Sequence, residues 1–463
     1  MVLVIAMSNA LLPFRLAAVG IPEEFRAQVL SCVNALAAKN IQGKALRRLF
    51  KRLGEDPQVF CSHPELSHLA TMLTGRVSDQ SQGVTTSWHS WGENLDPAAV
   101  EQMRAGCSLP VARGGALMPD AHVGYGLPIG GVLAVENAVI PYGVGMDIAC
   151  RMKMSVYAIP PDFLNSHEDD LAQALESETR FGVGATFARP KDHPVMHEDW
   201  SFSPVTRKMK DTAWAQLGTS GSGNHFVEWG ILDLHADKGP LTAGRYLALL
   251  SHSGSRGSGG EVAKYYSTLA RKEHPELSRE LGHLAWLDLD SDPGREYWAA
   301  MELMGRYSAA NHALIHSSMS GKLGFRAAWS VENHHNFAWI EEHAGTRLVV
   351  HRKGATPAGS GVFGVIPGTM VDPAFVVEGF GNPLSFNSAA HGAGRLMSRK
   401  EATRRCQRKD LEYALVQNRV RLLSGGLDEA PMAYKNIYDV MAWQSDLVRI
   451  IGTFQPRIVK MSK

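Results

Sequence analysis

The chain has 463 residues, of which 44% are hydrophobic and 20% are charged, so it is long enough and apolar enough to bury a sizeable core. Lysine and arginine together number 47 against 46 acidic residues, which leaves a net charge of +1. This balance excludes a protein that attracts nucleic acid through a global positive field, so a nucleic-acid partner would need a local basic patch.

Cysteine usage and the N-terminus bear on the cellular compartment. The five cysteines are widely spaced and odd in number, which argues against a secreted disulfide framework. The apolar run at residues 1–7 lacks a basic flank and only reaches the minimum length for the core of a signal peptide. No later apolar stretch approaches the length of a membrane span. We therefore expect a cytoplasmic protein without a membrane partner.

The N-terminal stretch is predicted to be helical. From residue 8 to about residue 75, apolar residues recur at three- and four-residue spacing, which is typical of amphipathic helices. One interpretation is a helical subdomain packed on the core, and the other is a face that contacts RNA. The basic residues that would build this face are Arg47, Arg48, Lys51 and Arg52.

The pattern changes at about residue 100 to short apolar runs between glycine-rich turns. Residues 131–159 are predicted to form strands joined by tight turns. Residues 183–210 are polar and contain prolines, which indicates a loop or a lid. Residues 261–345 are predicted to be mostly helical, residues 347–355 to form a strand and residues 398–424 to form another helix.

The organisation of the chain follows from this alternation of elements. No internal repeat and no clear linker is visible in the sequence. We therefore predict a mixed α/β (α+β) fold, with an N-terminal helical extension over residues 1–95 and a single catalytic domain over residues 96–463.

Histidine is unusually frequent, with 19 residues, and many of them lie beside glycine, serine or asparagine. A histidine in such a loop packs against little, so a chemical role becomes an option, and its small neighbours would let the backbone approach a ligand closely. The candidate metal ligands are Asp147 and Cys150 in YGVGMDIAC, His225 in GSGNHFVEW, His252 in SHSGSRGSG, and His334 and His335 in ENHHNFAW.

The composition of this set favours more than one metal ion. One carboxylate, one thiolate and three imidazoles are one ligand too many for a tetrahedral site. They suit two ions that share a bridging thiolate and leave positions open for phosphate oxygens. Thiolate and imidazole by themselves favour zinc. The alternative, that these histidines are hydrogen-bonded residues of the core or the surface, stays open at this point.

Three glycine-rich segments are candidates for phosphate binding. SHSGSRG places Arg256 beside several backbone amides, HRKGA adds Arg352 and Lys353, and HGAGR sets His391 ahead of two glycines at a predicted helix start. Each segment alone could be a structural turn. Three of them, each beside a histidine or a basic residue, point to nucleotide or polynucleotide chemistry.

His391 could be a nucleophile or a further metal ligand. A neutral imidazole can attack the α-phosphorus of a nucleoside triphosphate and form a phosphoramidate. Metal ions and arginines would then stabilise the charge that develops on the phosphates. The spacing of the residues does not decide between the two roles.

In order and together, these segments resemble the RtcB family of RNA-splicing and RNA-repair ligases from about residue 100 to the C-terminus. The resemblance rests on MPDAHVGYGLPIGG, GVGMDIAC, LGTSGSGNHFVEW, SHSGSRG, NHHNFAW, RKGA, PGTM, HGAGRLMSR and DEAPMAYK. It implies one large domain with mixed sheets around a deep, metal-containing cleft.

The resemblance also implies the site residues, motif by motif. Two Mn²⁺ ions would be bound by Asp147, Cys150, His225, His252 and His335, with Cys150 as the bridge. His335 is assigned instead of His334 because Asn336 follows it, as in the family pattern. The residues implied to hold GTP are Asn224, His225, Phe226, Val227, Glu228, His335, Asn336, Pro367, Gly368, Thr369, Met370, His391, Gly392, Ala393, Gly394, Tyr434 and Lys460.

The implied reaction is RNA joining. GTP guanylylates His391, GMP passes to an RNA 3′-phosphate, and a 5′-hydroxyl displaces it, after the same site has opened any 2′,3′-cyclic phosphate. RNA ends from tRNA splicing or repair and an archease-type activator are the implied partners. Glu228 can accept hydrogen bonds from guanine N1 and N2, and Phe226 offers a face to the base. Asp120 and His122 are expected either to orient metal ligands or to end a strand.

Three positions depart from the family pattern. Arg151 follows Cys150 where glycine is usual, which would place a cation close to the metal ions. Ala374 stands where a serine usually contacts the nucleotide, and Met461 follows Lys460 in place of glycine. We interpret these changes as a divergent branch of the family that serves RNA repair.

Other activities are compatible with the same residues. A two-metal phosphodiesterase or cyclic phosphatase would use the metal ligands to activate water, and it should survive His391→Ala. A non-catalytic module would bind GTP or RNA ends without releasing pyrophosphate. A fourth possibility is an enzyme that caps RNA ends with guanylate and does not seal them.

Overall fold

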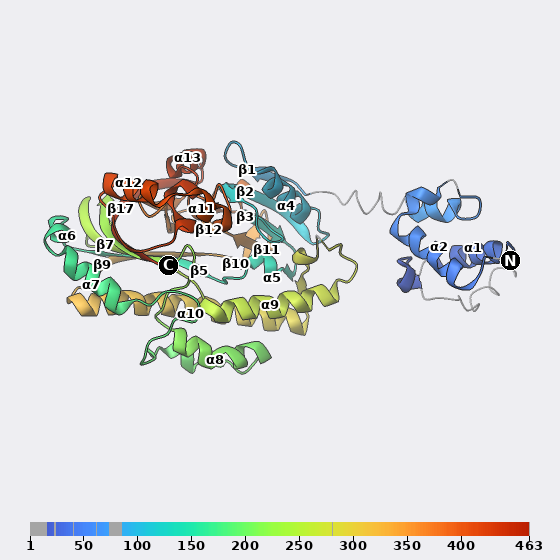
Figure 1. The fold of residues 1–463 in the computed structure, drawn as a ribbon, viewed down its shortest axis with the longest axis horizontal. Coiled ribbons are helices and arrows are strands. Elements are labelled where there is room, and N and C mark those ends of the chain that lie inside the picture. The colour runs from blue at the N-terminus through green and yellow to red at the C-terminus, as the bar shows by residue number, and fades with distance from the viewer. Residues whose placement is uncertain are drawn as a thin grey trace. The chain divides into compact units, whose positions relative to one another are not determined.

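The computed structural model describes residues 16–22, 25–39, 41–61, 63–73, 86–279 and 281–462. The chain folds as two compact units, Met1–Thr85 and Thr86–Lys463, and each is described by itself (Figure 1). Within the described residues, no helix combines the length and apolar character that crossing a bilayer requires. The apolar run at residues 1–7 lies outside the described residues.

The first unit is helical and has a hydrophobic core of its own. Its elements include η1 (Leu16–Val19), α1 (Arg26–Ala37), α2 (Gly43–Glu55) and η3 (Pro57–Phe60). Helix α2 buries Leu46, Phe50 and Leu53, which lie on one face because residues three and four apart are neighbours on a helix. The two helices α1 and α2 confirm the predicted helical character in this part of the chain.

The second unit contains two large sheets, so the predicted mixed α/β class is confirmed. The five-stranded sheet has the order β1 (Trp88–Ser90), β2 (Ala112–His122), β3 (Ile129–Val135), β11 (Thr346–Lys353) and β10 (Phe337–His343). The eight-stranded sheet has the order β13 (Phe363–Ile366), β14 (Ala374–Gly379), β17 (Val448–Met461), β6 (Phe226–Leu234), β7 (Gly244–Ser253), β5 (Cys150–Tyr157) and β9 (Ala327–His335), with β16 (Arg421–Ser424) beside β17. Two-stranded pairs join β12 (Ala355–Pro357) to β15 (Ser388–Ala390) and β4 (Ala138–Val139) to β8 (Leu287–Asp288).

Helices surround these sheets (Figure 1). They are α4 (Pro97–Cys107), α5 (Pro141–Val144), α6 (Asp162–Ser166), α7 (Glu168–Glu178), α8 (Pro204–Gln216), α9 (Arg256–Glu273), α10 (Asp292–Leu323), α11 (Arg399–Arg405), α12 (Arg408–Gln417) and α13 (Ile437–Trp443). Short 3₁₀ turns are η4 (Pro194–His197), η5 (Leu281–Leu284), η6 (Pro383–Ser385), η7 (Leu427–Glu429) and η8 (Pro431–Ala433). The long helix α10 begins at a Ser291 cap that accepts the Gly294 N–H, and it ends at Gly324 in the left-handed conformation.

The central strands of the eight-stranded sheet separate two environments. Side chains alternate between the faces of a strand, so the residues of β5, β6 and β7 divide into two sets. One set, which includes Val227, Trp229 and Leu249, packs with Leu171 and Ile315 of helices α7 and α10. The other set faces the opposite side and, at the ends of the strands, carries the candidate metal ligands.

Three of the predicted elements are wrong in part. Residues 327–343, predicted as helix, form β9 and β10, because each pairs with a distant strand, β5 and β11 respectively. The predicted helix at 398–424 breaks into α11 and α12 and then becomes β16, which pairs with β17. The predicted loop at 183–210 contains η4 and the start of α8 at Pro204.

The boundary between the units lies before the one expected at residues 95–96. Strand β1 pairs in parallel with β2, with Trp88 opposite Gly115 and Ser90 opposite Leu117. This pairing attaches residues 88–90 to the second unit, although they lie within the stretch expected to form the N-terminal extension.

Candidate metal and nucleotide site

A cavity of about 320 Å³ is lined by most of the residues predicted to carry chemistry. Asp147, Cys150, His252, His335 and His391 all line it. They come from the turn before β5, the ends of β7 and β9, and the loop after β15. Segments more than 200 residues apart in the sequence therefore meet in one site.

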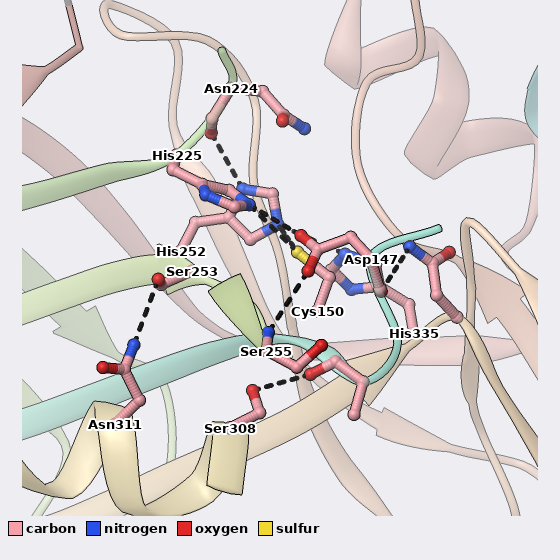
Figure 2. Close-up of polar contacts among 12 residues, drawn as sticks. Asp147, Cys150, Asn224, His225, His252, Ser253, Ser255, Ser308, Asn311 and His335 are labelled. Carbon is pink, nitrogen blue, oxygen red and sulfur yellow. Dashed lines mark hydrogen bonds and ion pairs between the residues drawn. The ribbon is translucent and has the colours of Figure 1, made fainter. Parts of the chain in front are cut away.

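Strand register brings the first group of donors together. In β5, Cys150 lies opposite His335 of β9, and Met152 lies opposite His252 of β7, so all three donor residues share one face of the sheet. The Sγ of Cys150 lies 3.1 Å from Nε2 of His252, and that nitrogen lies 3.2 Å from Nε2 of His335 (Figure 2).

A second group shares the same sulfur. The Nε2 of His225 lies 3.4 Å from Sγ of Cys150 and 3.0 Å from Oδ2 of Asp147. In each group the donor atoms lie within 4.8 Å of one another, and Cys150 belongs to both. The other carboxylate oxygen of Asp147 accepts the Ser255 N–H at 3.2 Å, which fixes its orientation (Figure 2).

Proton positions in the first group show why it fits a metal ion. Nδ1 of His252 lies 2.9 Å from the carbonyl oxygen of Asn224, which can only accept, so Nδ1 carries the hydrogen. Burial lowers the pKa of His252 to about 3 and that of His335 well below its ordinary value, so both rings are neutral. The Nε2 of His252 then carries a lone pair, which faces the sulfur of Cys150 and the Nε2 of His335. A cysteine sulfur and two imidazole nitrogens within reach of one point are donor types that a metal ion binds.

The pKa values of Cys150 and Asp147 also bear on whether the cluster fits a metal ion. Burial, together with the neighbouring Asp147 carboxylate, raises the pKa of the Cys150 thiol well above its ordinary value. Burial alone would also raise the pKa of Asp147, but the hydrogen bond and charge of His225 hold it below the ordinary value. Ionising this thiol beside the carboxylate would require a compensating cation, which a bound metal ion would supply, so the residues fit a metal centre.

Two glycines are needed for this packing. A Cβ on Gly254 would lie 2.0 Å from an oxygen of Asp147, and one on Gly221 would lie 2.0 Å from Nδ1 of His225. The turn is further held by Ser308 of α10, whose hydroxyl donates to the carbonyl oxygen of Ala149 at 2.8 Å (Figure 2). Any larger side chain at these glycines would displace a donor.

His391 lies beside the cluster and is oriented by a buried carboxylate. Its ring centroid is 4.8 Å from that of His335, and its Nδ1 donates to Oδ2 of Asp120 at 2.6 Å. Asp120, at the end of β2, is fully buried and also accepts the backbone N–H of His391 at 3.2 Å. Asp120 therefore orients His391 and leaves the Nε2 lone pair free to react. The predicted helix start at HGAGR is wrong, because residues 391–395 are irregular and α11 begins at Arg399.

The rest of the cavity is lined by the residues that the family resemblance assigned to the nucleotide. Phe226 and Glu228 of β6 line it together with the PGTM segment, residues 367–370, and with residues 392–394. Thr369 donates to Asp372 at 2.5 Å, which fixes the PGTM turn. Glu228 is 4% exposed, and burial raises the pKa of its carboxyl well above the ordinary value. Nothing in the described part of the chain forms a hydrogen bond or an ion pair with this carboxyl.

Asn224 and Asn336 brace the cavity through their side chains. The side-chain amide of Asn336 donates to the carbonyl oxygen of Asp147 at 3.2 Å and accepts the Gly354 N–H at 2.8 Å. These bonds connect the end of β9 to the turn that carries Asp147 and to the end of β11. Oδ1 of Asn224 accepts from Arg399 at 3.3 Å.

Two arginines also line the cavity: Arg395, which belongs to the predicted phosphate segment HGAGR, and Arg399, which was not singled out. Arg395 donates to the hydroxyl of Tyr434 at 3.0 Å and to Glu429 at 3.1 Å. Arg399 also pairs with Glu429, at 2.6 Å, and the Tyr434 hydroxyl donates to the same carboxylate. HGAGRLMSR and DEAPMAYK contain these residues, so the segments were recognised, but the sequence did not indicate that they meet.

The three cations predicted to bind phosphate are engaged elsewhere. Arg256 donates to Thr219 at 3.0 Å and to the carbonyl oxygen of Gly182 at 3.0 Å. Arg352 is fully buried and pairs with Glu341 at 2.6 Å. The Nζ of Lys353 donates to the carbonyl oxygens of residues 125 and 142. All three hold the scaffold, because burial requires that their charges be paired or hydrogen bonded.

The comparison with known proteins decides the family. The sequence profile described as "tRNA-splicing ligase RtcB" matches residues 102–461. The chain belongs to the RtcB family of RNA ligases. It is 33% identical over 376 residues to the RNA-splicing ligase RtcB of Escherichia coli, covering 73% of this chain and 88% of the relative. It is 29% identical over 417 residues to the tRNA-splicing ligase RtcB of Thermococcus kodakarensis, covering 73% and 86%.

The structure corrects two expectations drawn from the departures from the RtcB pattern. Arg151 does not extend toward the candidate metal ligands, because it faces the other side of β5 and donates to Glu332 at 3.1 Å. Lys460 also faces away from the cavity, and its Nζ pairs with Glu176 at 2.8 Å and donates to the Leu175 carbonyl oxygen. Met461 and Ala374 line the cavity in its place.

Val227 is another residue that was implied to hold GTP but whose side chain points away from the cavity. It alternates with Phe226 and Glu228 along β6, so its side chain packs in the core on the α10 side of the sheet. His334 is likewise separated from the cluster, and its ring contacts Phe337 and Trp339. The structure therefore brings His335, and not His334, to the other donors.

Proposed function

We propose that this RtcB-family protein is a GTP- and Mn²⁺-dependent RNA ligase that works through a guanylylated His391. It would join RNA 2′,3′-cyclic phosphate or 3′-phosphate ends to 5′-hydroxyl ends, in tRNA splicing or RNA repair. The observation that carries the proposal is the position of His391, held by Asp120 through Nδ1 at 2.6 Å beside a cluster of metal-type donors.

The first chemical step follows from that geometry. With Nδ1–H donated to Asp120, the Nε2 lone pair attacks the α-phosphorus of GTP, a P–N bond forms, and the bond to pyrophosphate breaks. The buried carboxylate stabilises the positive charge that develops on the ring, much as a triad aspartate stabilises its histidine.

Two later transfers complete the joining reaction. An oxygen of the RNA 3′-phosphate attacks the guanylyl phosphorus, which breaks the P–N bond and restores His391. The 5′-hydroxyl of the second RNA end then attacks the activated 3′-phosphate, forms the phosphodiester and releases GMP. A 2′,3′-cyclic phosphate is first hydrolysed to a 3′-phosphate in the same cavity.

The metal ligands would be the two groups that share Cys150. Asp147 and His225 would hold one Mn²⁺, His252 and His335 the other, and Cys150 both. When bound, the ions supply positive charge to phosphate oxygens during each transfer. Sulfur and imidazole donors also suit zinc, so the identity of the ion rests on the family and not on the donor set.

Recognition of guanine would fall to Glu228. Its carboxyl is buried in the cavity without a partner in the described part of the chain, and burial disfavours its ionised form. The N1 and N2 hydrogens of guanine would compensate it, whereas adenine offers no such pair of donors. Phe226 would stack on the base. The nucleotide would further contact Asn224, His225, His335, Asn336, Pro367, Gly368, Thr369, Met370, Gly392, Ala393, Gly394 and Tyr434.

Partners and location complete the proposal. RNA ends are the substrate, and an archease-type protein is a candidate activator. The protein would work in the cytoplasm, where reducing conditions keep the Cys150 thiol available to a metal ion.

Labelled GTP provides the test. The protein is incubated with α-³²P-GTP and Mn²⁺ and run on a denaturing gel, and then given RNA with 2′,3′-cyclic phosphate and 5′-hydroxyl ends. We expect an acid-labile, alkali-stable label on the wild type that His391→Ala lacks, followed by joined RNA. Joining that persists in His391→Ala would contradict the proposal, as would label transfer to RNA ends that are never sealed.

A further inference from the structure

The first unit, which lies outside the part of the chain that matches the RtcB profile, carries a concentrated basic face. Helix α2 has five cations in 13 residues, Lys44, Arg47, Arg48, Lys51 and Arg52, against one carboxylate, Glu55. The whole chain has a net charge of only +1, so this helix departs strongly from its background. All five cationic side chains are exposed.

Four of these cations surround one hollow. Lys44, Arg47, Arg48 and Lys51, together with Ala18 of η1, line a surface depression of about 310 Å³. The four lie at positions i, i+3, i+4 and i+7, which share one face of a helix and extend about 10 Å along its axis. A length of about 10 Å reaches two or three successive phosphates of one nucleic-acid strand.

The charges on this face are not used by the fold. Among the residues that the structure describes, no carboxylate pairs with Lys44, Arg47 or Arg48, and the contact of Lys51 with Glu55, at 3.7 Å, is between two exposed side chains. The first turn of α2 contains Lys44 and no acidic residue, so this cation lies near the positive end of the helix dipole, where it reduces helix stability. A selected function outside the fold explains such an arrangement better than stability does.

We propose that the basic face of α2, formed by Lys44, Arg47, Arg48 and Lys51, is an auxiliary RNA-binding site that holds the sugar-phosphate backbone of the RNA being joined. The proposal rests on RNA being the substrate of the second unit. Binding here is electrostatic and independent of sequence, so it raises the local concentration of RNA ends without selecting them.

An anionic membrane is the competing partner, and the structure disfavours it. A helix that lies on a bilayer needs an exposed apolar face opposite its charged face. Leu46, Phe50 and Leu53 of α2 are each at most 3% exposed and lie in the core of the unit, and Leu49 is partly buried against the same core. Only the charged face is free to bind a partner.

The test compares two full-length variants. In the first, Lys44→Gln, Arg47→Gln, Arg48→Gln and Lys51→Gln remove the charge but keep good helix formers. In the second, Lys44→Arg, Arg47→Lys, Arg48→Lys and Lys51→Arg keep the charge and change the side chains. Binding of a labelled 30-nucleotide RNA is measured by fluorescence anisotropy at several salt concentrations, and circular dichroism checks that the helices are retained.

We expect the glutamine variant to bind RNA at least about 10-fold more weakly than the wild type. The slope of the logarithm of affinity against the logarithm of salt concentration should become shallower by about 0.7 for each phosphate that the variant no longer binds. The charge-preserving variant should bind RNA like the wild type. The Michaelis constant for RNA should rise in the glutamine variant while labelling by GTP in the absence of RNA continues. Equal affinity and equal salt dependence in all three proteins would overturn the proposal. So would a glutamine variant that loses binding to phosphatidylserine vesicles but not to RNA. Either result would leave the ligase assignment intact, because His391 labelling is measured separately.

Discussion

Buried histidines lie on both faces of strands β5, β7 and β9, and the two sets differ in how their protons are placed. On the α10 face, the histidines and serines form a complete chain of hydrogen bonds. His312 Nε2 donates to the carbonyl oxygen of Ser253 at 3.1 Å, so its Nδ1 accepts from the Ser251 hydroxyl at 2.7 Å. Ser251 in turn accepts from Nε2 of His316 at 2.8 Å, and Nδ1 of His316 accepts from Ser155 at 2.8 Å. Every nitrogen has a partner of the right kind.

On the cavity face hydrogen bonding is incomplete, because Nδ1 of His225 and Nδ1 of His335 are buried without a hydrogen-bond partner among the described residues. His252 and His335 approach through their Nε2 atoms at 3.2 Å, with the sulfur of Cys150 3.1 Å from His252. Burial lowers the pKa of His316 to about 3 and that of His252 to about 3, so neither burial nor pKa distinguishes the two faces. The completeness of hydrogen bonding distinguishes them, and the face on which it is incomplete carries the candidate metal ligands.

The largest difference between the two faces is expected for two adjacent histidines that lie on opposite sides of β9. We expect His335→Ala to lower RNA joining by more than about 1,000-fold, beyond the loss typical of residues that only support a metal ligand. His334→Ala, whose ring contacts Phe337 and Trp339, should keep joining and Mn²⁺ binding. Initial rates of joining at saturating RNA measure both, and equal losses would mean that the division between faces is wrong.

Asp120→Asn tests how the nucleophile is oriented. An asparagine amide would donate to Nδ1 of His391 and force the hydrogen onto Nε2, which removes the attacking lone pair. We expect the rate of guanylylation to fall by about 1,000-fold or more, as for the equivalent change in a catalytic triad. Mn²⁺ content should be retained. Single-turnover labelling with α-³²P-GTP measures the rate, and labelling at the wild-type rate would exclude a role for Asp120.

Glu228→Gln should weaken nucleotide selection and at the same time stabilise the fold. We expect preference for GTP over ATP to fall by about 10- to 100-fold in competition labelling.

The effect of Glu228→Gln on stability should depend on pH. Because burial raises the folded-state pKa of Glu228 above its ordinary value, the wild type loses stability as pH rises from the ordinary pKa through the raised pKa. Melting temperatures should therefore be higher for the variant at pH 7, with the difference shrinking toward pH 4. A variant that is less stable than the wild type at pH 7 would contradict this explanation.

The smallest effect on activity is expected on the α10 face. His312→Leu leaves the Ser251 hydroxyl without an acceptor and the Ser253 carbonyl without a donor, which should lower the free energy of unfolding by about 2 to 4 kcal/mol. Urea denaturation measures this loss. Mn²⁺ content and labelling at 25 °C should be retained in the folded protein. Loss of the metal with unchanged stability would show that this face also serves the site.

Sequence alone predicted the α/β class and the segments that form the cavity, because glycine-rich loops beside Asp147, His252 and His391 are local features. It did not predict which way strand residues point. Arg151 and Lys460 were expected at the site, yet each alternates with a neighbour, Cys150 or Met461, that faces the cavity instead. Strand register depends on pairing between distant segments, as between β5 and β9, and no local pattern reports it.

The dependence on pairing between distant segments also explains why residues 327–343 were predicted as helix and why the partner of Asp120 was not predicted. Residues 327–343 have apolar spacing that suits a helix as well as a strand, and only pairing with β5 and β11 decides. The contact of Asp120 with His391 joins residues 271 positions apart, so the sequence could suggest an orienting role for Asp120 but not which side chain it orients.

If the donors around Cys150 form a metal centre, removing Cys150 should change the metal content of the protein. Wild type, Cys150→Ala and Cys107→Ala are dialysed with Mn²⁺, freed of excess ion and analysed by mass spectrometry for bound metal. Cys107 is the matched control, because it is equally buried and burial raises its pKa to about 12, but it lies in an apolar core. We predict about two ions per chain in the wild type and in Cys107→Ala, and at most one in Cys150→Ala. Equal metal content in all three proteins would contradict the account.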